Sequence, residues 1–242
     1  PEKLPDLAKL NSVDIEQSIK TAAARRIAIA TSAVTRGNRL IERHPGSRGG
    51  LWLVYDFATT SGDQNIFENP QGPHSALYGQ KPFKPDEIRA IYVLPNGFYA
   101  FALYDAAGNR IDRVLPGIEK PYAGVEADAV EPTTKTGVRC FACHSDGLVE
   151  AKDDFKTAFD ASAPLSPSRA TALRLFGTDS ENTLLLIGSR DRYHLAVRSV
   201  GIDPNARLRG AELVTGLAER YREGAVFEIG RASCRERVSN CV

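Results

Sequence analysis

The fold of this chain is constrained most strongly by two apolar runs, 88–94 and 98–104, that lie on either side of an Asn-Gly dipeptide. Asn and Gly both tolerate a positive φ, so this dipeptide between apolar runs is a strong signal for a β-hairpin. The earlier segment 51–57 is rich in aromatic and β-branched residues and predicts another strand. We therefore predict an antiparallel β-meander over residues 51–116.

Helical patterns flank the meander on both sides. An Ala-rich segment over 13–35 carries apolar residues at near-helical spacing and predicts an N-terminal helix. From residue 137 onward, turn residues separate several segments with helical patterns. We predict helices over 153–159, 167–176, 191–200 and 208–222.

The composition excludes some classes of function. Of the 242 residues, 42% are hydrophobic and 25% are charged, close to an ordinary globular protein. Lys and Arg number 31 and Asp and Glu number 30, so the chain lacks the basic excess that general binding to nucleic acid usually needs. No apolar run approaches the length of a transmembrane helix. We therefore predict no nucleic-acid partner and no transmembrane segment.

The ends of the chain look unlike natural ends. The stretch EIGRASCRERV, which begins at Glu228, reads as the translation of a sequencing adapter. We therefore predict that native sequence stops near Phe227 and that residues 228–242 are read-through. The chain also starts at Pro1, so we expect a fragment whose signal sequence is not included. The predicted organisation is a linker and helix (1–50), the β-meander (51–116), a helical region (117–227) and the read-through tail (228–242).

One short motif carries specific chemistry. The sequence contains C-x-x-C-H at Cys140, Cys143 and His144, which is the attachment signature of c-type haem. Two thiols at this spacing can form thioether bonds to one porphyrin, and the adjacent imidazole can bind the iron as the proximal ligand. A thioredoxin-like dithiol and half of a zinc site are the alternatives, although neither a βαβ pattern nor a second Cys or His pair accompanies the motif. We predict one covalent haem c.

The sequence offers several candidates for the second axial ligand. The chain has no Met, which is the distal ligand of many electron-transfer cytochromes. The remaining histidines are His44, His74 and His194, and Lys, Tyr, Asn or an open site are further possibilities. We favour His44, which follows a segment that could be a helical turn and could reach the iron from its end.

The sequence also resembles a known group of proteins. The segments TRGNRLIERHPG, GGLWLVYDFATTSGDQNIFENPQGP, EIRAIYVLPNGFYAFALYDAAGNRID, TGVRCFACHSDGL and DRYHLAVRSVG are similar to exported bacterial cytochrome c domain-containing proteins with a single embedded C-x-x-C-H site. The resemblance implies haem binding by Cys140, Cys143 and His144 and a role in electron transfer. Its ERH segment adds support to His44. Members often carry Met beside the haem motif, where this chain has Leu148.

These observations predict an α+β fold, with an antiparallel β-meander flanked by an N-terminal helix and followed by a helical, cytochrome c-like haem-binding region. We predict single-electron transfer to a redox partner protein or an adjoining domain. Because haem is attached covalently outside the bacterial cytoplasm, we predict a periplasmic or otherwise exported protein. One alternative is a haem enzyme or a gas or redox sensor with an open distal site. Another is a ligand-binding β-module with an accessory haem. No catalytic residue is predicted, and a carrier is favoured over a catalyst.

Overall fold

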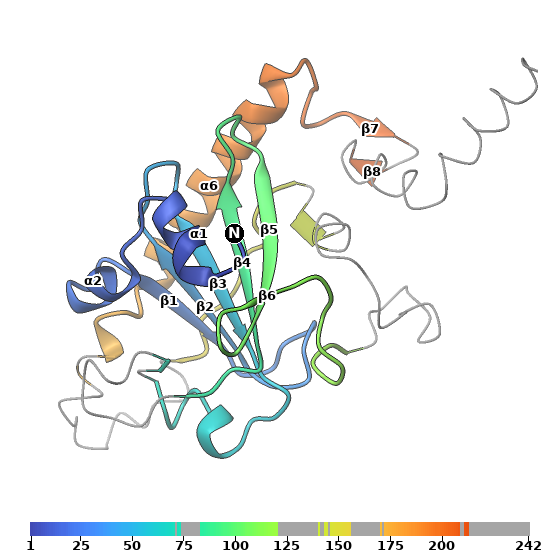
Figure 1. Cartoon of the computed structure of the whole chain (residues 1–242). Helices are drawn as coiled ribbons and strands as arrows, with labels where there is room; N and C mark the ends of the chain where they lie inside the picture. The colour runs from blue at the N-terminus through green and yellow to red at the C-terminus, as the bar shows by residue number, and fades with distance from the viewer. Residues whose placement is uncertain are drawn as a thin grey trace, which may run out of the picture.

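A computed structural model describes residues 1–70, 72–73, 83–120, 140, 143–144, 146–155, 170, 172–208 and 211–212. The described residues form a six-stranded antiparallel sheet in which every strand pairs with the next along the chain (Figure 1). The strands are β1 (Arg25–Ile29), β2 (Arg39–His44), β3 (Leu51–Asp56), β4 (Glu87–Val93), β5 (Tyr99–Asp105) and β6 (Arg110–Ile111). Sequential pairing keeps the contacts between strands local in the sequence.

The β4–β5 hairpin forms where the Asn-Gly dipeptide predicts it. Gly97 has a φ of 86°, and its N–H donates to the carbonyl of Leu94 at 2.9 Å. The N–H of Leu94 in turn donates to the carbonyl of Phe98 at 2.8 Å. An added Cβ at Gly97 would lie 2.7 Å from the Cβ of Ala196. Glycine is therefore required here by both the turn and the packing of the neighbouring helix.

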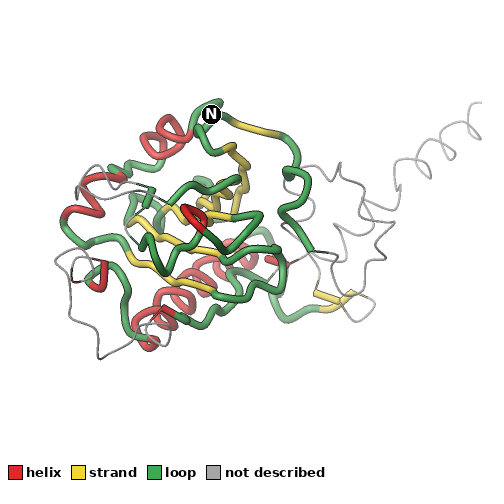
Figure 2. Tube along the Cα trace, turned by 90° about the horizontal axis from the view of Figure 1, so that it is seen from below, coloured by secondary structure: helices red, strands yellow, loops and turns green. Residues whose placement is uncertain are grey.

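The two faces of the sheet are covered by different helices. The short helices α1 (Leu4–Leu10) and α2 (Ile15–Lys20) lie on one face, and the long helix α6 (Asp179–Ser199) lies on the other (Figure 2). A 3₁₀ turn, η1 (Gly62–Gln64), lies in the β3–β4 connection. The short strands β7 (Arg207–Leu208) and β8 (Ala211–Glu212) pair with each other after α6.

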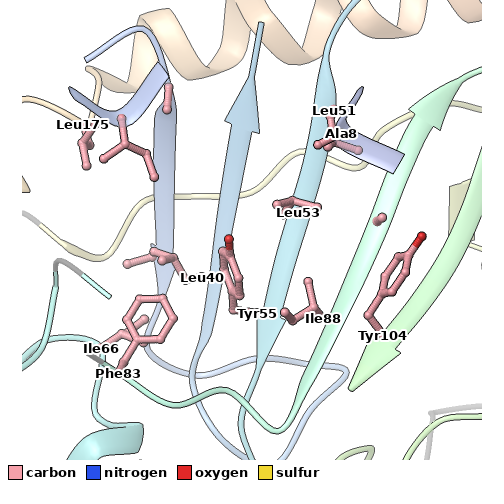
Figure 3. Close-up of a cluster of buried hydrophobic side chains, with 14 of the residues drawn as sticks. Ala8, Leu40, Leu51, Leu53, Tyr55, Ile66, Phe83, Ile88, Tyr104 and Leu175 are labelled. Atoms are coloured by element: carbon pink, nitrogen blue, oxygen red, sulfur yellow. The ribbon is translucent and has the colours of Figure 1, made fainter. Parts of the chain in front are cut away.

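Strand alternation divides the core in the same way. On the face beneath α1 and α2, the largest buried cluster includes Leu40, Tyr55, Ile88 and Tyr104 from successive strands (Figure 3). On the opposite face, Trp52, Ile91 and Tyr99 pack against Leu186, Tyr193 and Val197 of α6. Successive residues of a strand point to opposite faces, so each strand contributes to both clusters.

The outer edge of β1 is covered by chain from the C-terminal half. The N–H of Arg26 donates to the carbonyl of Leu175 at 2.8 Å, and the N–H of Asp154 donates to the carbonyl of Ala28 at 2.8 Å. The carboxylate of Asp153 accepts a hydrogen bond from the N–H of Ala28 at 2.9 Å. Covering an edge strand in this way satisfies backbone groups that would otherwise invite pairing with another chain.

The predicted fold class is wrong in two respects. The segment 13–35 is not one helix, because α2 ends at Lys20, Ala22 adopts a φ of 54°, and β1 follows as a strand of the sheet. The helical, cytochrome c-like region is not evident in the described part of 117–227, where α6 is the one long helix. Residues 153–154 bind to β1, and residues 207–208 and 211–212 are strands.

The other predicted helices can be compared with the structure only where their residues are described. The predicted helix 191–200 falls almost wholly within α6. Of the predicted helix 167–176, residues 170 and 172–176 are described, and residues 170 and 172–173 are helical. Most of 208–222 and all of 228–242 lie outside the described residues. In the described ranges, no helix combines the length and the apolar character needed to cross a membrane.

Candidate functional site

The C-x-x-C-H motif begins in helical backbone. Cys140, Cys143 and His144 all have helical conformation, and residues spaced three and four apart lie on the same face of a helix. Cys140 is half-buried and Cys143 is exposed. The motif follows the sheet in the sequence and packs against the same face as α6, because the ring centroid of His144 lies 5.8 Å from that of Phe101 on β5.

A cavity of about 470 Å³ lies beside the motif. One side is formed by the sheet, through apolar residues that we call the sheet wall: Ile27, Ile29, Ile41, Trp52, Val54 and Ile91. The other side is formed by Cys143, His144 and residues 148–151, with Leu186 from α6. Its volume is within the range of about 300–1,000 Å³ that is typical of small-molecule and cofactor sites.

The imidazole of His144 is oriented by its own loop. Its Nδ1 lies 3.2 Å from the carbonyl oxygen of Gly147, and the N–H of Gly147 donates to the carbonyl of His144 at 3.2 Å. With the proton on Nδ1, the lone pair of Nε2 is available to a metal. Gly147 has a φ of 110°, and an added Cβ would lie 3.0 Å from the side chain of Arg190. Glycine therefore allows the tight loop that holds this imidazole.

The charge state of His144 suits metal binding. Burial lowers the pKa of His144 below its ordinary value, the hydrogen bond with Gly147 opposes this shift, and the positive charges of Arg39 and Arg89 add to it. A lowered pKa favours the neutral imidazole, which is the form that binds a metal.

A charged side chain, Arg39, is part of the cavity lining. Arg39 lines the cavity and donates two hydrogen bonds to Asp56, from Nε to Oδ1 at 2.6 Å and from Nη2 to Oδ2 at 2.9 Å. The Nε of Arg89 lies 2.6 Å from Oδ2 of the same carboxylate. Two guanidinium groups thus share one buried carboxylate, and Arg39 is the one that brings a charge-assisted hydrogen-bond donor to the cavity lining.

The electrostatics of this cluster are dominated by pairing. Burial by itself raises the pKa of Asp56, but Arg39 and Arg89 outweigh burial and hold the pKa below its ordinary value. Arg89 also lies 2.8 Å from Glu119 and 3.0 Å from Glu87. The carboxyl of Glu87 differs from that of Asp56, because burial raises its pKa more than Arg89 lowers it.

His194 lies close to the motif, whereas His44 does not. The Nε2 of His194, on α6, is 2.8 Å from the carboxylate of Asp146, which ties the loop after His144 to this helix. His44 is on β2 rather than at the end of a helical turn, and it is fully buried on the face beneath α1 and α2. The structure therefore does not bring His44 and His144 together, because the sheet lies between them.

Both nitrogens of His44 have partners within the core. Nδ1 lies 2.6 Å from the hydroxyl of Ser18, and Nε2 lies 2.8 Å from Oε1 of Glu42. The other oxygen of Glu42 accepts a hydrogen bond from Nε of Arg26 at 2.6 Å. His44 thus belongs to a buried polar network that satisfies its hydrogen-bonding groups. His74 lies outside the described residues.

Sequence reasoning missed the sheet wall and the Arg39–Asp56–Arg89 cluster. The alternation of residues in the segments RRIAI and RLIERH, which form β1 and β2, carries the signal for part of the wall. The cluster has no local signal, because its members come from three different strands.

Within the described ranges, no group of three or more His, Cys, Asp or Glu side chains is arranged to hold a metal ion by itself. Comparison with protein-family models, with curated proteins and with solved structures finds no match to this chain.

Proposed function

We propose that this chain binds one haem c covalently and transfers single electrons outside the cytoplasm. The observation that carries the proposal is the apolar cavity directly beside the C-x-x-C-H motif, with Cys143 and His144 in its lining. The motif alone could serve a dithiol site, and an apolar cavity alone could take many ligands. Together they provide attachment, an iron ligand and an apolar volume of suitable size.

Each part of the site has a defined role in this proposal. Cys140 and Cys143 form the thioether bonds, and His144 binds the iron through Nε2 while Gly147 keeps the proton on Nδ1. Arg39, held in place by Asp56, attracts a carboxylate of the cofactor. When bound, the haem supplies one-electron chemistry at its iron.

The apolar lining also has a function. The sheet wall keeps water away from the site and lowers the local dielectric, and both effects influence a redox potential. The proposed partner is a redox protein or an adjoining domain. An exported location follows from the covalent attachment, which takes place outside the bacterial cytoplasm.

The test is covalent haem attachment in a bacterial host. The full chain is exported with an added signal sequence alongside the maturation machinery for c-type cytochromes. We expect haem that stays on the polypeptide through denaturing electrophoresis. The Cys140→Ala/Cys143→Ala variant should lose all of this haem.

The chain offers a matched control for this test. The variant Cys234→Ala/Cys241→Ala removes the other two cysteines and should keep full attachment. A wild-type chain that stays free of haem, in a host that matures a standard c-type cytochrome, would overturn the proposal. Equal attachment in both double variants would also contradict it.

A second candidate is a haem sensor or enzyme with an exchangeable distal site. The observation that favours it is the aliphatic character of Ile27, Ile41 and Val54, which line the cavity from the sheet and carry no atom that can bind iron. A spectrum of the reduced, haem-loaded protein with and without CO distinguishes the two. Rapid formation of a CO complex favours the sensor or enzyme, and resistance to CO favours the six-coordinate carrier.

A further inference from the structure

The outer face of α6 carries a stripe of residues with heptad spacing. The inner face packs against the sheet through Leu186, Tyr193 and Val197. On the solvent side, steps of three and four residues connect the members of what we call the α6 stripe: Glu181, Leu184, Gly188, Asp191, Leu195 and Arg198. Leu184 is 68% exposed and Leu195 is 62% exposed. Alternating steps of three and four are the pattern by which one helix packs along another.

The stripe is self-complementary when it is read in reverse. In an antiparallel pair of identical helices, a two-fold axis between residues 189 and 190 places Leu184 opposite Leu195. The same axis places the acidic Glu181 opposite the basic Arg198, and Gly188 opposite Asp191. A two-fold interface repeats each of these contacts twice, so apolar groups face apolar groups and acidic groups face basic groups at both ends.

Gly188 provides an independent reason to expect a close neighbour. Glycine is less favourable than alanine in the middle of a helix, because it loses more backbone freedom on folding. An added Cβ at Gly188 would meet no atom within 4 Å in the described part of the chain. Packing among the described residues therefore does not require glycine at this position, whereas a second helix that approaches closely would.

We propose that the α6 stripe is a homodimer interface, in which α6 of a second copy of this chain packs antiparallel along it. The leucines form the apolar centre of each half, and the Glu181–Arg198 pairs lie at the two ends. At a rise of 1.5 Å per residue, the two copies of Asp191 lie about 4.5 Å apart along the axis, so their carboxylates repel each other. The pair is therefore weak and depends on concentration. This proposal is independent of haem binding.

The test is analytical ultracentrifugation of the full chain over a wide range of concentration. We expect a reversible monomer–dimer equilibrium in the wild type. Leu184→Glu should raise the dissociation constant at least tenfold, because it places two acidic groups, one from each copy, opposite the Leu195 side chains. Leu10→Glu is the matched control, since Leu10 is 57% exposed on α1, away from the stripe, and it should leave the equilibrium unchanged.

Two further variants should change the dissociation constant of the dimer in opposite directions. Asp191→Asn removes the repulsion at the axis and should lower the dissociation constant several-fold. Gly188→Ala should raise the thermal midpoint of the monomer but increase the dissociation constant of the dimer. If Gly188 had only a role within its own helix, the dissociation constant would not change. Sedimentation as a monomer at every concentration in both the wild type and Asp191→Asn would overturn the proposal. So would equal dissociation constants for Leu184→Glu and Leu10→Glu.

Discussion

At the scale of single residues, the buried charged side chains of this sheet are stabilised by ion pairs and hydrogen bonds to their neighbours. Asp56 is fully buried, yet two arginines hold its pKa below the ordinary value. On the opposite face, Glu42 is fully buried between Arg26, His44 and Tyr55, whose hydroxyl donates to Glu42 at 2.9 Å. A buried carboxylate without partners would be costly, so each of these networks depends on all of its members.

We predict that Asp56→Asn lowers the free energy of unfolding by about 3–5 kcal/mol at neutral pH, because it removes the carboxylate that Arg39 is paired with and one of those paired with Arg89. Urea denaturation measures this loss. The pKa of Asp56 is lowered in the folded protein, so its stabilisation is present above its ordinary value of 3.8 and is lost as the pH falls through the folded value.

The difference between wild type and Asp56→Asn should therefore shrink on going from neutral pH to about pH 3. Asp112→Asn serves as the control, since Asp112 is a surface carboxylate 3.8 Å from Arg110, and it should change stability little at either pH. A difference that stays constant with pH would contradict an ionised Asp56.

At the scale of secondary-structure elements, the local sequence predicts the correct element where its preference agrees with the tertiary contacts. The β4–β5 hairpin was predictable because its turn residues and its flanking apolar runs favour the same conformation. The segment 13–35 was mispredicted because its alanines favour helix, while β1 gains more by pairing with β2 and burying Ala28 and Ile27. Tertiary packing overrode helix propensity, which is a weak preference.

The start of α6 is defined by a capping box. The Thr178 hydroxyl accepts a hydrogen bond from the N–H of Glu181 at 3.2 Å, and the Glu181 carboxylate accepts one from the N–H of Thr178 at 2.7 Å. We predict that Thr178→Ala lowers the free energy of unfolding by about 1 kcal/mol, whereas Thr178→Asp, another good N-cap, keeps most of the stability. Chemical denaturation of the two variants measures this. Equal stability of Thr178→Ala and Thr178→Asp would show that the cap contributes nothing.

At the scale of the whole molecule, the candidate site is a product of assembly. The cavity is formed by four strands, by the loop after the C-x-x-C-H motif, and by α6. His194 and Asp146 join two of these parts at 2.8 Å. A substitution in the cavity lining should therefore change the stability of the protein by different amounts in the cofactor-free and cofactor-bound forms.

We predict that Ile41→Phe has opposite effects on the two forms. In the haem-free protein the larger ring fills part of the cavity, so the thermal midpoint should stay the same or rise. In the haem-loaded protein the ring overpacks the site, and stability should fall by about 1–3 kcal/mol. Thermal denaturation followed by circular dichroism compares them, with Leu10→Phe as a control outside the cavity. The same shift in both forms would mean that the cavity does not hold the haem.

The sequence by itself determined the C-x-x-C-H spacing and the β4–β5 hairpin, because both depend on residues that are close together in the chain. Only the tertiary structure decided which face of the sheet each side chain occupies. His44 and Arg39 lie on the same strand, yet an odd spacing sends them to opposite faces, so Arg39 lines the cavity and His44 enters a buried network. The reason is physical: strand side chains alternate with a period of two, and which face meets the motif depends on long-range packing that no local pattern encodes.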